Sequence, residues 1–204
     1  MWKAGVLMVA NAQKKWTVEE YLAFERASET RHEYFAGDIF AMSGASRRHN
    51  LIVTNTITTL NLQLAQRPCE VYPSDMRIKV NAIKYTYPDV SVVCAEPQFI
   101  DGEFDTLLNP TVIIEVLSDS TEDYDRGKKF KHYMGITSLQ EYILIAQDET
   151  RIDHYVRQSH GDWLLSYATT LETQLIIKSI NCTLLLADVY RKITFEIDDS
   201  PKND

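Results

Sequence analysis

Two acidic residues lie in apolar segments, where burial makes an ionised carboxylate costly. Glu115 lies in the segment 111–117, between two large aliphatic residues on the same face of a predicted strand. Asp89 begins a second apolar segment, 89–94. A buried carboxylate must be neutralised, paired or bound to a cation, and two on neighbouring strands would repel each other. We therefore predict a hard divalent cation, Mg²⁺ or Mn²⁺, between them. The alternative is that each carboxylate meets water or an arginine at a strand end.

A basic segment further along the chain supplies a candidate positive charge for this pair. Phe130 and Met134 are four residues apart on a predicted helix, so we expect both side chains to face the core. Lys129 and Tyr133 form the adjacent row, which would border the sheet and bring the lysine to the carboxylates. The alternative, a solvated basic face, fits Lys128, which is also a weak candidate for contact with nucleic acid.

The hydrophobic periodicity predicts the elements that must position these residues. Thr17-Val-Glu-Glu20 has the form of a capping box and predicts a first helix. The order is helix, hairpin, helix, strands, helix, strands, which favours an α/β or α+β domain with a mixed sheet flanked by helices. Helices are expected at 17–29, 46–66 and 124–134, and strands at 31–35, 39–43, 70–72, 77–80, 89–94, 111–117, 141–146, 152–157 and 163–167.

The composition is typical of one globular domain. The chain has 204 residues, of which 45% are hydrophobic and 25% charged. We expect an N-terminal extension at 1–16, a single domain at 17–197 and a disordered tail at 198–204. The formal net charge of −8 gives no support to nucleic-acid binding, which draws on basic surface.

The cysteines and the N-terminal segment bear on the compartment. Cys69, Cys94 and Cys182 are odd in number and far apart, without a C-x-x-C pair. We therefore predict free thiols in a reducing cytosol rather than disulfides or a zinc site. The apolar run 5–10 is too short to span a bilayer and has a poor signal-peptide flank, so we expect a cytoplasmic protein with no membrane partner.

An ordered set of short segments resembles a known family. The chain is similar to the Uma2 family (DUF820) of the PD-(D/E)xK restriction-endonuclease-like superfamily from about residue 17 to residue 195. The resemblance implies a mixed sheet flanked by helices and a Mg²⁺-dependent phosphodiesterase site. It is carried by the segments Arg31–Asp38, Arg48–Asn50, Tyr87–Val93, Val112–Ser118, Asp125–Phe130 and Glu141–Ile145.

The family motif can be placed on this chain residue by residue. The resemblance makes Asp89 the aspartate of the PD element and Glu115 the acid of the (D/E)xK element. Glu33 matches the acidic position on the early hairpin. The superfamily lysine lies two residues after the acid, where this chain has Leu117. The resemblance implies that Lys129, on the downstream helix, takes over its role.

These residues lead to a hypothesis of phosphodiester hydrolysis. Asp89 and Glu115, with the backbone carbonyl of Val116, would hold one Mg²⁺ ion, which lowers the pKa of a bound water and offsets charge in the transition state. Lys129 would orient or deprotonate that water, or neutralise nonbridging oxygens. Glu33 would complete a second metal site or polarise the water. The alternative for Glu33 is an ordinary exposed strand residue.

Contacts with the substrate are harder to predict from the sequence. The expected partner is nucleic acid, with DNA preferred, and cleavage of both strands by one site per chain favours a homodimer. Asp75 and Asp125 are candidates for an outer layer of the metal site. Arg47, Arg48 and His49 begin a helix and are weak candidates for phosphate contact, with a solvated helix end as the equal alternative.

Two other functions remain open at this level. The first is a catalytically silent module of nuclease fold whose acidic surface binds a protein or a second copy, with the strands in 141–157 as a pairing surface. The second is a hydrolase of a small phosphodiester, which fits the acidic composition better than a nuclease does.

Overall fold

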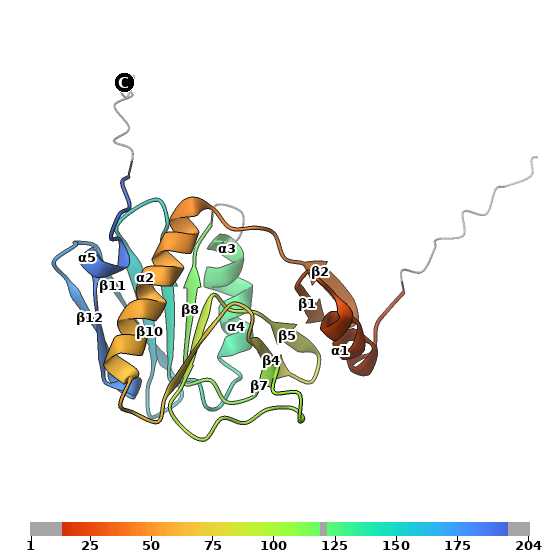
Figure 1. The fold of residues 1–204 in the computed structure, drawn as a ribbon. Coiled ribbons are helices and arrows are strands. Elements are labelled where there is room, and N and C mark those ends of the chain that lie inside the picture. Colours follow the sequence, from red (N-terminus) through yellow and green to blue (C-terminus); the bar gives the residue numbers. More distant parts are fainter. Residues whose placement is uncertain (1–13, 119–121, 196–204) are drawn as a thin grey trace, which may run out of the picture.

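A six-stranded mixed sheet lies at the centre of the protein (Figure 1). The computed structural model describes residues 14–118 and 122–195, so the tail predicted at 198–204 and most of the extension predicted at 1–16 lie outside the described residues. β8 and β9 are parallel and the other neighbours are antiparallel. In spatial order the strands are β11 (Trp163–Ala168), β10 (Ile152–Arg157), β9 (Glu141–Ile145), β8 (Val112–Val116), β6 (Val90–Val93) and β3 (Glu70–Pro73).

One face of this sheet is covered by the longest helix and the C-terminal hairpin. The covering elements are α2 (Arg47–Leu64), β12 (Gln174–Ile177), the 3₁₀ turn η2 (Lys178–Ile180), β13 (Cys182–Leu185) and α5 (Leu186–Val189). Their apolar side chains and those of alternate residues in β6, β8 and β9 form the largest core. This layer therefore accounts for one of the two buried faces that the apolar runs in β6 and β8 require.

The opposite face packs against a helical segment and a second sheet (Figure 1). The helical segment comprises α3 (Glu122–Tyr124), the π-helical turn η1 (Asp125–Lys129) and α4 (Phe130–Tyr133). The second sheet has the order β2 (Asp38–Ala41), β1 (His32–Phe35), β5 (Lys84–Thr86), β4 (Arg77–Asn81) and β7 (Thr106–Leu107). α1 (Val18–Ala27) packs on this sheet through aromatic and aliphatic side chains. The fold class predicted from the sequence is confirmed.

Local sequence signals explain the helix starts and the hairpin. Thr17 and Glu20 make both bonds of the predicted capping box at α1. Ser46 caps α2 by accepting a hydrogen bond from a backbone N–H in its first turn. In the turn between β1 and β2, Ala36 and Gly37 have φ angles of 49° and 91°. Glycine adopts a positive φ without strain, which suits Gly37 to this turn.

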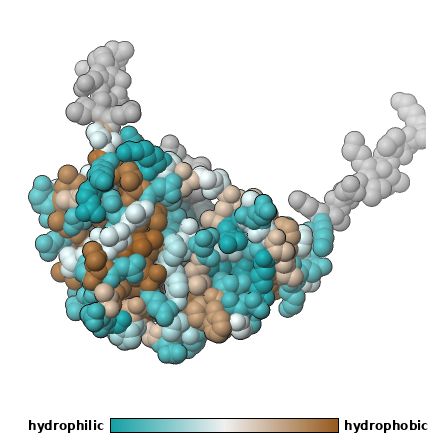
Figure 2. Space-filling view, in the orientation of Figure 1, coloured by the Kyte–Doolittle hydropathy of each residue, from teal (hydrophilic) through white to brown (hydrophobic). Residues whose placement is uncertain are grey.

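The buried face of α2 combines apolar and polar side chains. Leu60 and Leu64 are buried, whereas Val53 and Ile57 are only partly buried. Asn55 is buried instead, and its amide donates to two backbone carbonyls near the end of α5. Figure 2 shows apolar residues in a band alongside α2. No helix in the described part of the chain has the length and apolar character needed to cross a membrane.

Some strands were not predicted, and one predicted surface is internal. The unpredicted strands are β5, β7, β12 and β13. The strands in 141–157, predicted as a pairing surface, are β9 and β10. Because β9 is central and β11 covers β10, neither is at an edge of the sheet.

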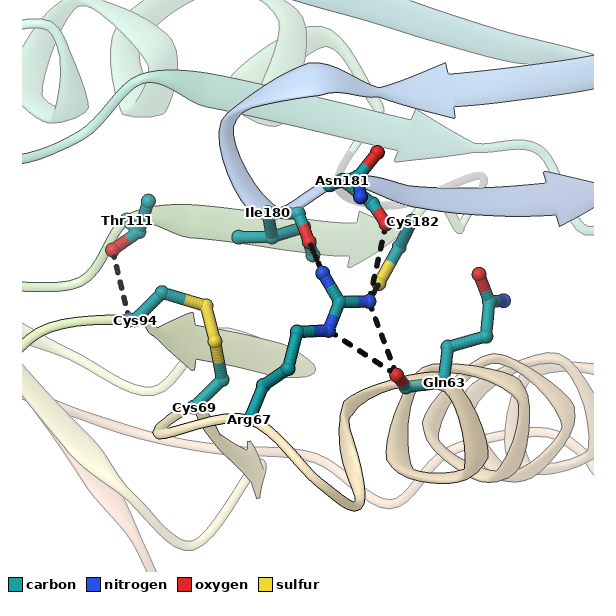
Figure 3. Close-up of a disulfide and its surroundings, with 8 residues drawn as sticks. All are labelled: Gln63, Arg67, Cys69, Cys94, Thr111, Ile180, Asn181 and Cys182. Atoms are coloured by element: carbon teal, nitrogen blue, oxygen red, sulfur yellow. Dashed lines mark hydrogen bonds between the residues drawn. A yellow bond between two sulfur atoms is a disulfide. The ribbon is translucent and has the colours of Figure 1, made fainter.

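The cysteine prediction is wrong for two of the three residues. Cys69 and Cys94 form a disulfide (Figure 3). Cys69 directly precedes β3 and Cys94 directly follows β6, and the antiparallel register that pairs Glu70 with Val93 places the cysteines opposite each other. Only Cys182 is a buried free thiol. The disulfide removes the support that free thiols gave to a reducing compartment.

Candidate active site

Asp89 and Glu115 lie side by side: Asp89 directly precedes β6, and Glu115 is on the neighbouring strand β8. The antiparallel register pairs Val90 with Ile114, so the next step places Asp89 opposite Glu115. The Asp89 N–H lies 3.4 Å from Glu115 Oε2, and Asp89 Oδ2 accepts a hydrogen bond of 2.7 Å from the Val116 N–H. The structure therefore brings the two carboxylates together as the sequence predicted, because a period of two and a shared register put them on one face.

His49 reaches the same pair from the start of α2. Its Nε2 atom lies 2.9 Å from Asp89 Oδ1. Ser46, the N-cap residue, accepts a hydrogen bond from the His49 N–H and so fixes the first turn of the helix. The sequence suggested His49 as a weak phosphate contact; in the structure its ring faces the aspartate, and both partners are largely buried.

Lys129 enters the site from the π-helical turn. Its Nζ atom lies 2.8 Å from Glu115 Oε1 and 3.2 Å from Asp125 Oδ1. The sequence predicted Phe130 and Met134 as the core row; Phe130 does pack against the core, but Met134 is 37% exposed. The row of Lys129 and Tyr133 is buried instead. A π turn holds more residues than an α turn, so it rotates the side chains relative to the predicted regular helix.

Burial and pairing shift the ionisation of this cluster. Burial raises the pKa of Glu115 to about 8; Lys129 acts against this shift and the charges of Asp89 and Asp125 add to it. Burial opposes the charge on Lys129, but the attraction of Glu115 and of the other acidic groups outweighs it and raises the pKa of Lys129 well above its ordinary value. Lys129 therefore stays an ammonium ion at neutral pH.

Glu33 lies across a cavity from the central strands. Its carboxylate accepts a hydrogen bond from the Thr86 hydroxyl and lies 4.0 Å from Lys129 Nζ. The cavity has a volume of about 590 Å³. It is lined by six residues that the sequence predicted for the site, together with the segment 40–46; the six are Glu33, His49, Asp89, Glu115, Val116 and Lys129.

A seventh predicted residue, Asp125, also lines the cavity beside Lys129. The remaining predicted residues lie elsewhere. Arg47 and Lys128 are exposed, and neither they nor Arg48 line the cavity. Asp75 lies outside it and pairs with Arg31 on the surface. The fold thus brings the predicted carboxylates and Lys129 to one cavity, whereas most of the predicted phosphate contacts do not line it.

Sequence reasoning missed several polar residues of the site. Tyr133 donates a hydrogen bond of 2.9 Å to Glu115. Tyr124 and Tyr87 line the cavity, and Lys84 donates to the Tyr124 hydroxyl. Tyrosines are common in cores, so periodicity alone could not single these out. The one available signal was Lys84 itself, a charged residue that is buried in a short strand.

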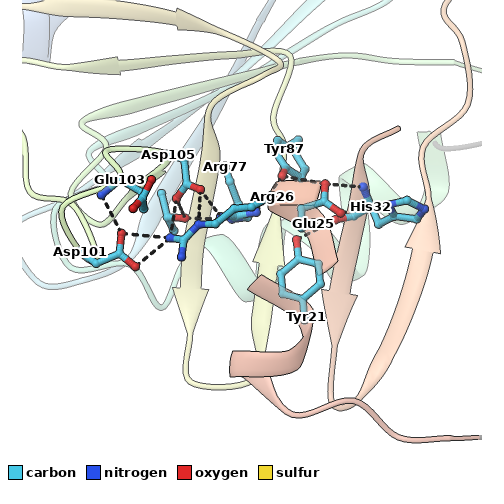
Figure 4. A network of polar contacts seen from close by, with 10 residues as sticks. Tyr21, Glu25, Arg26, His32, Arg77, Tyr87, Asp101, Glu103 and Asp105 are labelled. Carbon is cyan, nitrogen blue, oxygen red and sulfur yellow. Dashed lines mark hydrogen bonds and ion pairs between the residues drawn. The ribbon is translucent and has the colours of Figure 1, made fainter. Parts of the chain in front are cut away.

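A buried polar network holds two strands of the site in place (Figure 4). The Glu25 carboxylate accepts hydrogen bonds from the Tyr87 hydroxyl at 2.9 Å and from the His32 backbone N–H at 2.8 Å. Tyr87 is two residues from Asp89, and His32 is next to Glu33. The Arg77 guanidinium donates to the Tyr87 hydroxyl from the other side. One buried carboxylate therefore ties together the segments that carry two of the candidate site residues.

The site fits a hard divalent cation in donor type and in charge. Four carboxyl groups line the cavity and two lysines lie beside them, so two formal negative charges are uncompensated when all four acids are ionised. Within the described ranges, no three His, Cys, Asp or Glu side chains are grouped so that they alone could hold a metal ion. Mg²⁺ commonly binds through one or two carboxylates and keeps several waters. The pair Asp89 and Glu115 suits that mode of binding.

The fold matches a solved nuclease-like structure. A protein of Anabaena variabilis, described as a "putative nuclease belonging to DUF820", superposes with a TM-score of 0.69 at 21% sequence identity, over 86% of this chain and 97% of that chain. The mixed sheet, its flanking helices and this likeness define a protein of restriction-endonuclease-like fold.

Closer relatives identify the family. The family model "Uma2: Putative restriction endonuclease" matches residues 18–185. Two proteins of Synechocystis sp., the uncharacterized proteins slr1290 and sll1609, are 39% and 38% identical to this chain over 183 and 161 residues. These alignments cover 89% and 78% of this chain and 94% and 91% of the relatives. The chain belongs to the Uma2 family.

Proposed function

We propose that the protein is an endonuclease that uses Mg²⁺ or Mn²⁺ to hydrolyse phosphodiester bonds in DNA. The observation that carries this proposal is the meeting of Asp89, Glu115 and Lys129 at one cavity. Two acids and a lysine that come from three different elements have no structural need to converge, and the excess negative charge favours a cation. The family supports the nuclease class.

The roles follow from the contacts of each residue. Asp89 and Glu115, with the carbonyl of Val116, would hold the cation, which when bound lowers the pKa of a water and offsets charge on the phosphoryl oxygens. Lys129 keeps its charge beside them and orients the attacking water or neutralises a nonbridging oxygen. His49 fixes the orientation of the Asp89 carboxylate.

Glu33 has a separate role on the far side of the cavity. Its carboxylate is held by the hydroxyl of Thr86 and lies at the limit of ion-pair distance from Lys129. From this position Glu33 polarises the attacking water or completes a second metal site.

DNA would approach through the segment that leads into α2. Arg47 is exposed next to Ser46, which lines the cavity, and the N-terminus of α2 carries a partial positive charge. Phosphate contact there is local, which reconciles a DNA substrate with a net charge of −8.

The test is nicking of supercoiled plasmid DNA with Mg²⁺ or Mn²⁺. Asp89→Asn and Glu115→Gln should each lower the rate by roughly 100-fold or more, because each removes a ligand of the cation. Glu172→Gln, an exposed acid outside the cavity, is the matched control and should leave the rate unchanged. If calorimetry detects no divalent cation bound to the wild-type protein, the catalytic proposal fails.

The net charge of −8 favours one alternative, hydrolysis of a small phosphodiester. A small anion needs only the cavity, whereas a duplex must also approach the acidic surface around it. Comparing turnover of plasmid DNA, cyclic nucleotides and dinucleotides at equal phosphodiester concentration separates the two functions. Turnover confined to the small substrates would replace the endonuclease proposal.

A further inference from the structure

A buried lysine that the proposed mechanism does not use lies directly behind the cavity. Lys84, on β5, is 2% exposed, and its Nζ atom donates to the Tyr124 hydroxyl oxygen at 2.5 Å. The ammonium group also lies over the rings of Phe35 and Tyr124, at 5.4 and 5.1 Å from their centroids. Burying an ammonium ion costs free energy, so its position behind one hydroxyl indicates that Lys84 has a role there.

The hydrogen bond from Lys84 fixes the direction in which Tyr124 can donate. An ammonium group has donors and no acceptor, so the tyrosine oxygen must be the acceptor in this pair. The hydroxyl proton of Tyr124 then points away from Lys84. Among residues 14–118 and 122–195, the structure shows no protein acceptor for that proton. The side chain of Tyr124 lines the cavity, so the cavity is where the proton is available.

The surroundings show what kind of ligand would use this donor. Tyr124 shares the cavity with Glu33, Glu115 and Lys129, so its hydroxyl lies on the rim of the cluster proposed to hold the cation. A donor polarised by a buried cation favours an anionic acceptor, because a charge-assisted hydrogen bond is stronger than a neutral one. A nonbridging oxygen of a phosphodiester has the required charge and size.

We propose that Tyr124 donates its hydroxyl hydrogen bond to a nonbridging phosphate oxygen of the substrate, and that Lys84 is a positioning residue that acts through Tyr124. This inference rests on the proposed function and adds a residue that touches the substrate. Tyr124 binds the phosphate opposite the carboxylates, and its contact strengthens as negative charge grows on that oxygen in the transition state.

The test is a double-mutant cycle on hydrolysis of bis(p-nitrophenyl) phosphate by the full chain with Mn²⁺. Tyr124→Phe keeps the ring and removes the donor, so kcat/KM should fall about tenfold or more. Lys84→Met should cause a similar fall. Because Lys84 acts through Tyr124, adding Lys84→Met to Tyr124→Phe should cause little further loss. Tyr72→Phe, on the edge strand β3 and outside the cavity, is the matched control.

Two outcomes of the cycle overturn the inference. One is a wild-type value of kcat/KM for the Tyr124→Phe variant. This outcome can be observed even if the Lys84→Met variant fails to fold. The other is independent, multiplicative losses from the two substitutions.

A binding measurement separates this inference from the function on which it rests. If the wild-type protein turns over no diester, the affinity for dimethyl phosphate in the presence of Mg²⁺ is measured by titration calorimetry. Weaker binding by Tyr124→Phe than by the wild type then supports the phosphate contact although catalysis has failed. Equal affinity of the two proteins overturns the contact.

Discussion

At the scale of the residue, Glu115 and Lys129 form a buried ion pair in the candidate site. Both side chains are almost fully buried, and Lys129 lies within hydrogen-bonding distance of the carboxylate. Tyr133 donates a second hydrogen bond to the same oxygen of Glu115. A buried ion pair adds little stability compared with an apolar pair, but the loss of one partner leaves the other charge without compensation.

We expect Lys129→Met to destabilise the protein by about 3 kcal/mol in the absence of divalent cations and at a pH above the raised pKa of Glu115, because it leaves the ionised Glu115 carboxylate without its cation. Adding Glu115→Gln should recover most of that loss, since the amide needs no counter-charge. Urea unfolding of Lys129→Met, Glu115→Gln and the double variant measures the effect. A double variant whose loss equals the sum of the two single losses would show that the two residues are not coupled.

At the scale of the element, the π-helical turn η1 decides which side chains reach the site. A regular helix over the same segment would present different rows, whereas η1 buries Asp125 and Lys129 together and places them 3.2 Å apart. π turns are rare and often occur at functional sites. We propose that the turn supplies, through Lys129, the lysine that the superfamily motif places at the position of Leu117.

The disulfide between Cys69 and Cys94 acts on the segment that contains Asp89. It closes a loop with a sequence separation of 25 residues, comprising β3, β4, β5 and β6. We expect its reduction, or Cys69→Ser, to lower the free energy of unfolding by about 3 kcal/mol, since a loop of this length gains that much chain entropy when opened.

Guanidinium unfolding with and without dithiothreitol measures this contribution. Cys182→Ser is the matched control, because Cys182 is a free thiol whose sulfur accepts a hydrogen bond from Arg67 (Figure 3). The free energy of unfolding of the Cys182→Ser variant should respond to dithiothreitol as that of the wild type does. A wild-type protein whose stability is insensitive to the reductant would rule out the disulfide in solution.

At the scale of the whole molecule, the two edges of the six-stranded sheet differ. β3 is short and carries Glu70 and Pro73, which discourage pairing with another strand. β11 has six residues and no charged side chain, and Leu165 and Tyr167 are 48% and 69% exposed. In a chain with a net charge of −8, such an uncharged strand is where a second copy meets the least repulsion.

We therefore expect a homodimer formed by antiparallel pairing of β11 with its copy. Sedimentation equilibrium should give about twice the chain mass of 23.5 kDa. Leu165→Lys puts a charge on the pairing strand and should shift the protein to monomer, while Lys178→Gln, on the exposed 3₁₀ turn, should leave the dimer intact. A monomeric wild-type protein at micromolar concentration contradicts this expectation.

The sequence alone determined the class of fold and pointed to Asp89 and Glu115 as the central acids of the candidate site. The period-two pattern around Glu115 and the apolar run after Asp89 indicated strands buried on both faces. Because polar residues are rare in such strands, the two acids could be identified as candidate site residues. The capping box of Thr17 and Glu20 fixed the first helix because its hydrogen bonds are local. These features depend on residues that are neighbours in the chain, so the sequence carries them directly.

Only the tertiary structure decided which distant residues meet. The disulfide of Cys69 with Cys94 depends on strand register, and the contact of His49 with Asp89 depends on where α2 packs. The pairing of Lys84 with Tyr124 likewise joins two elements that are 40 residues apart in the chain. Contacts of this kind are set by how helices and sheets pack against one another, which no local period encodes.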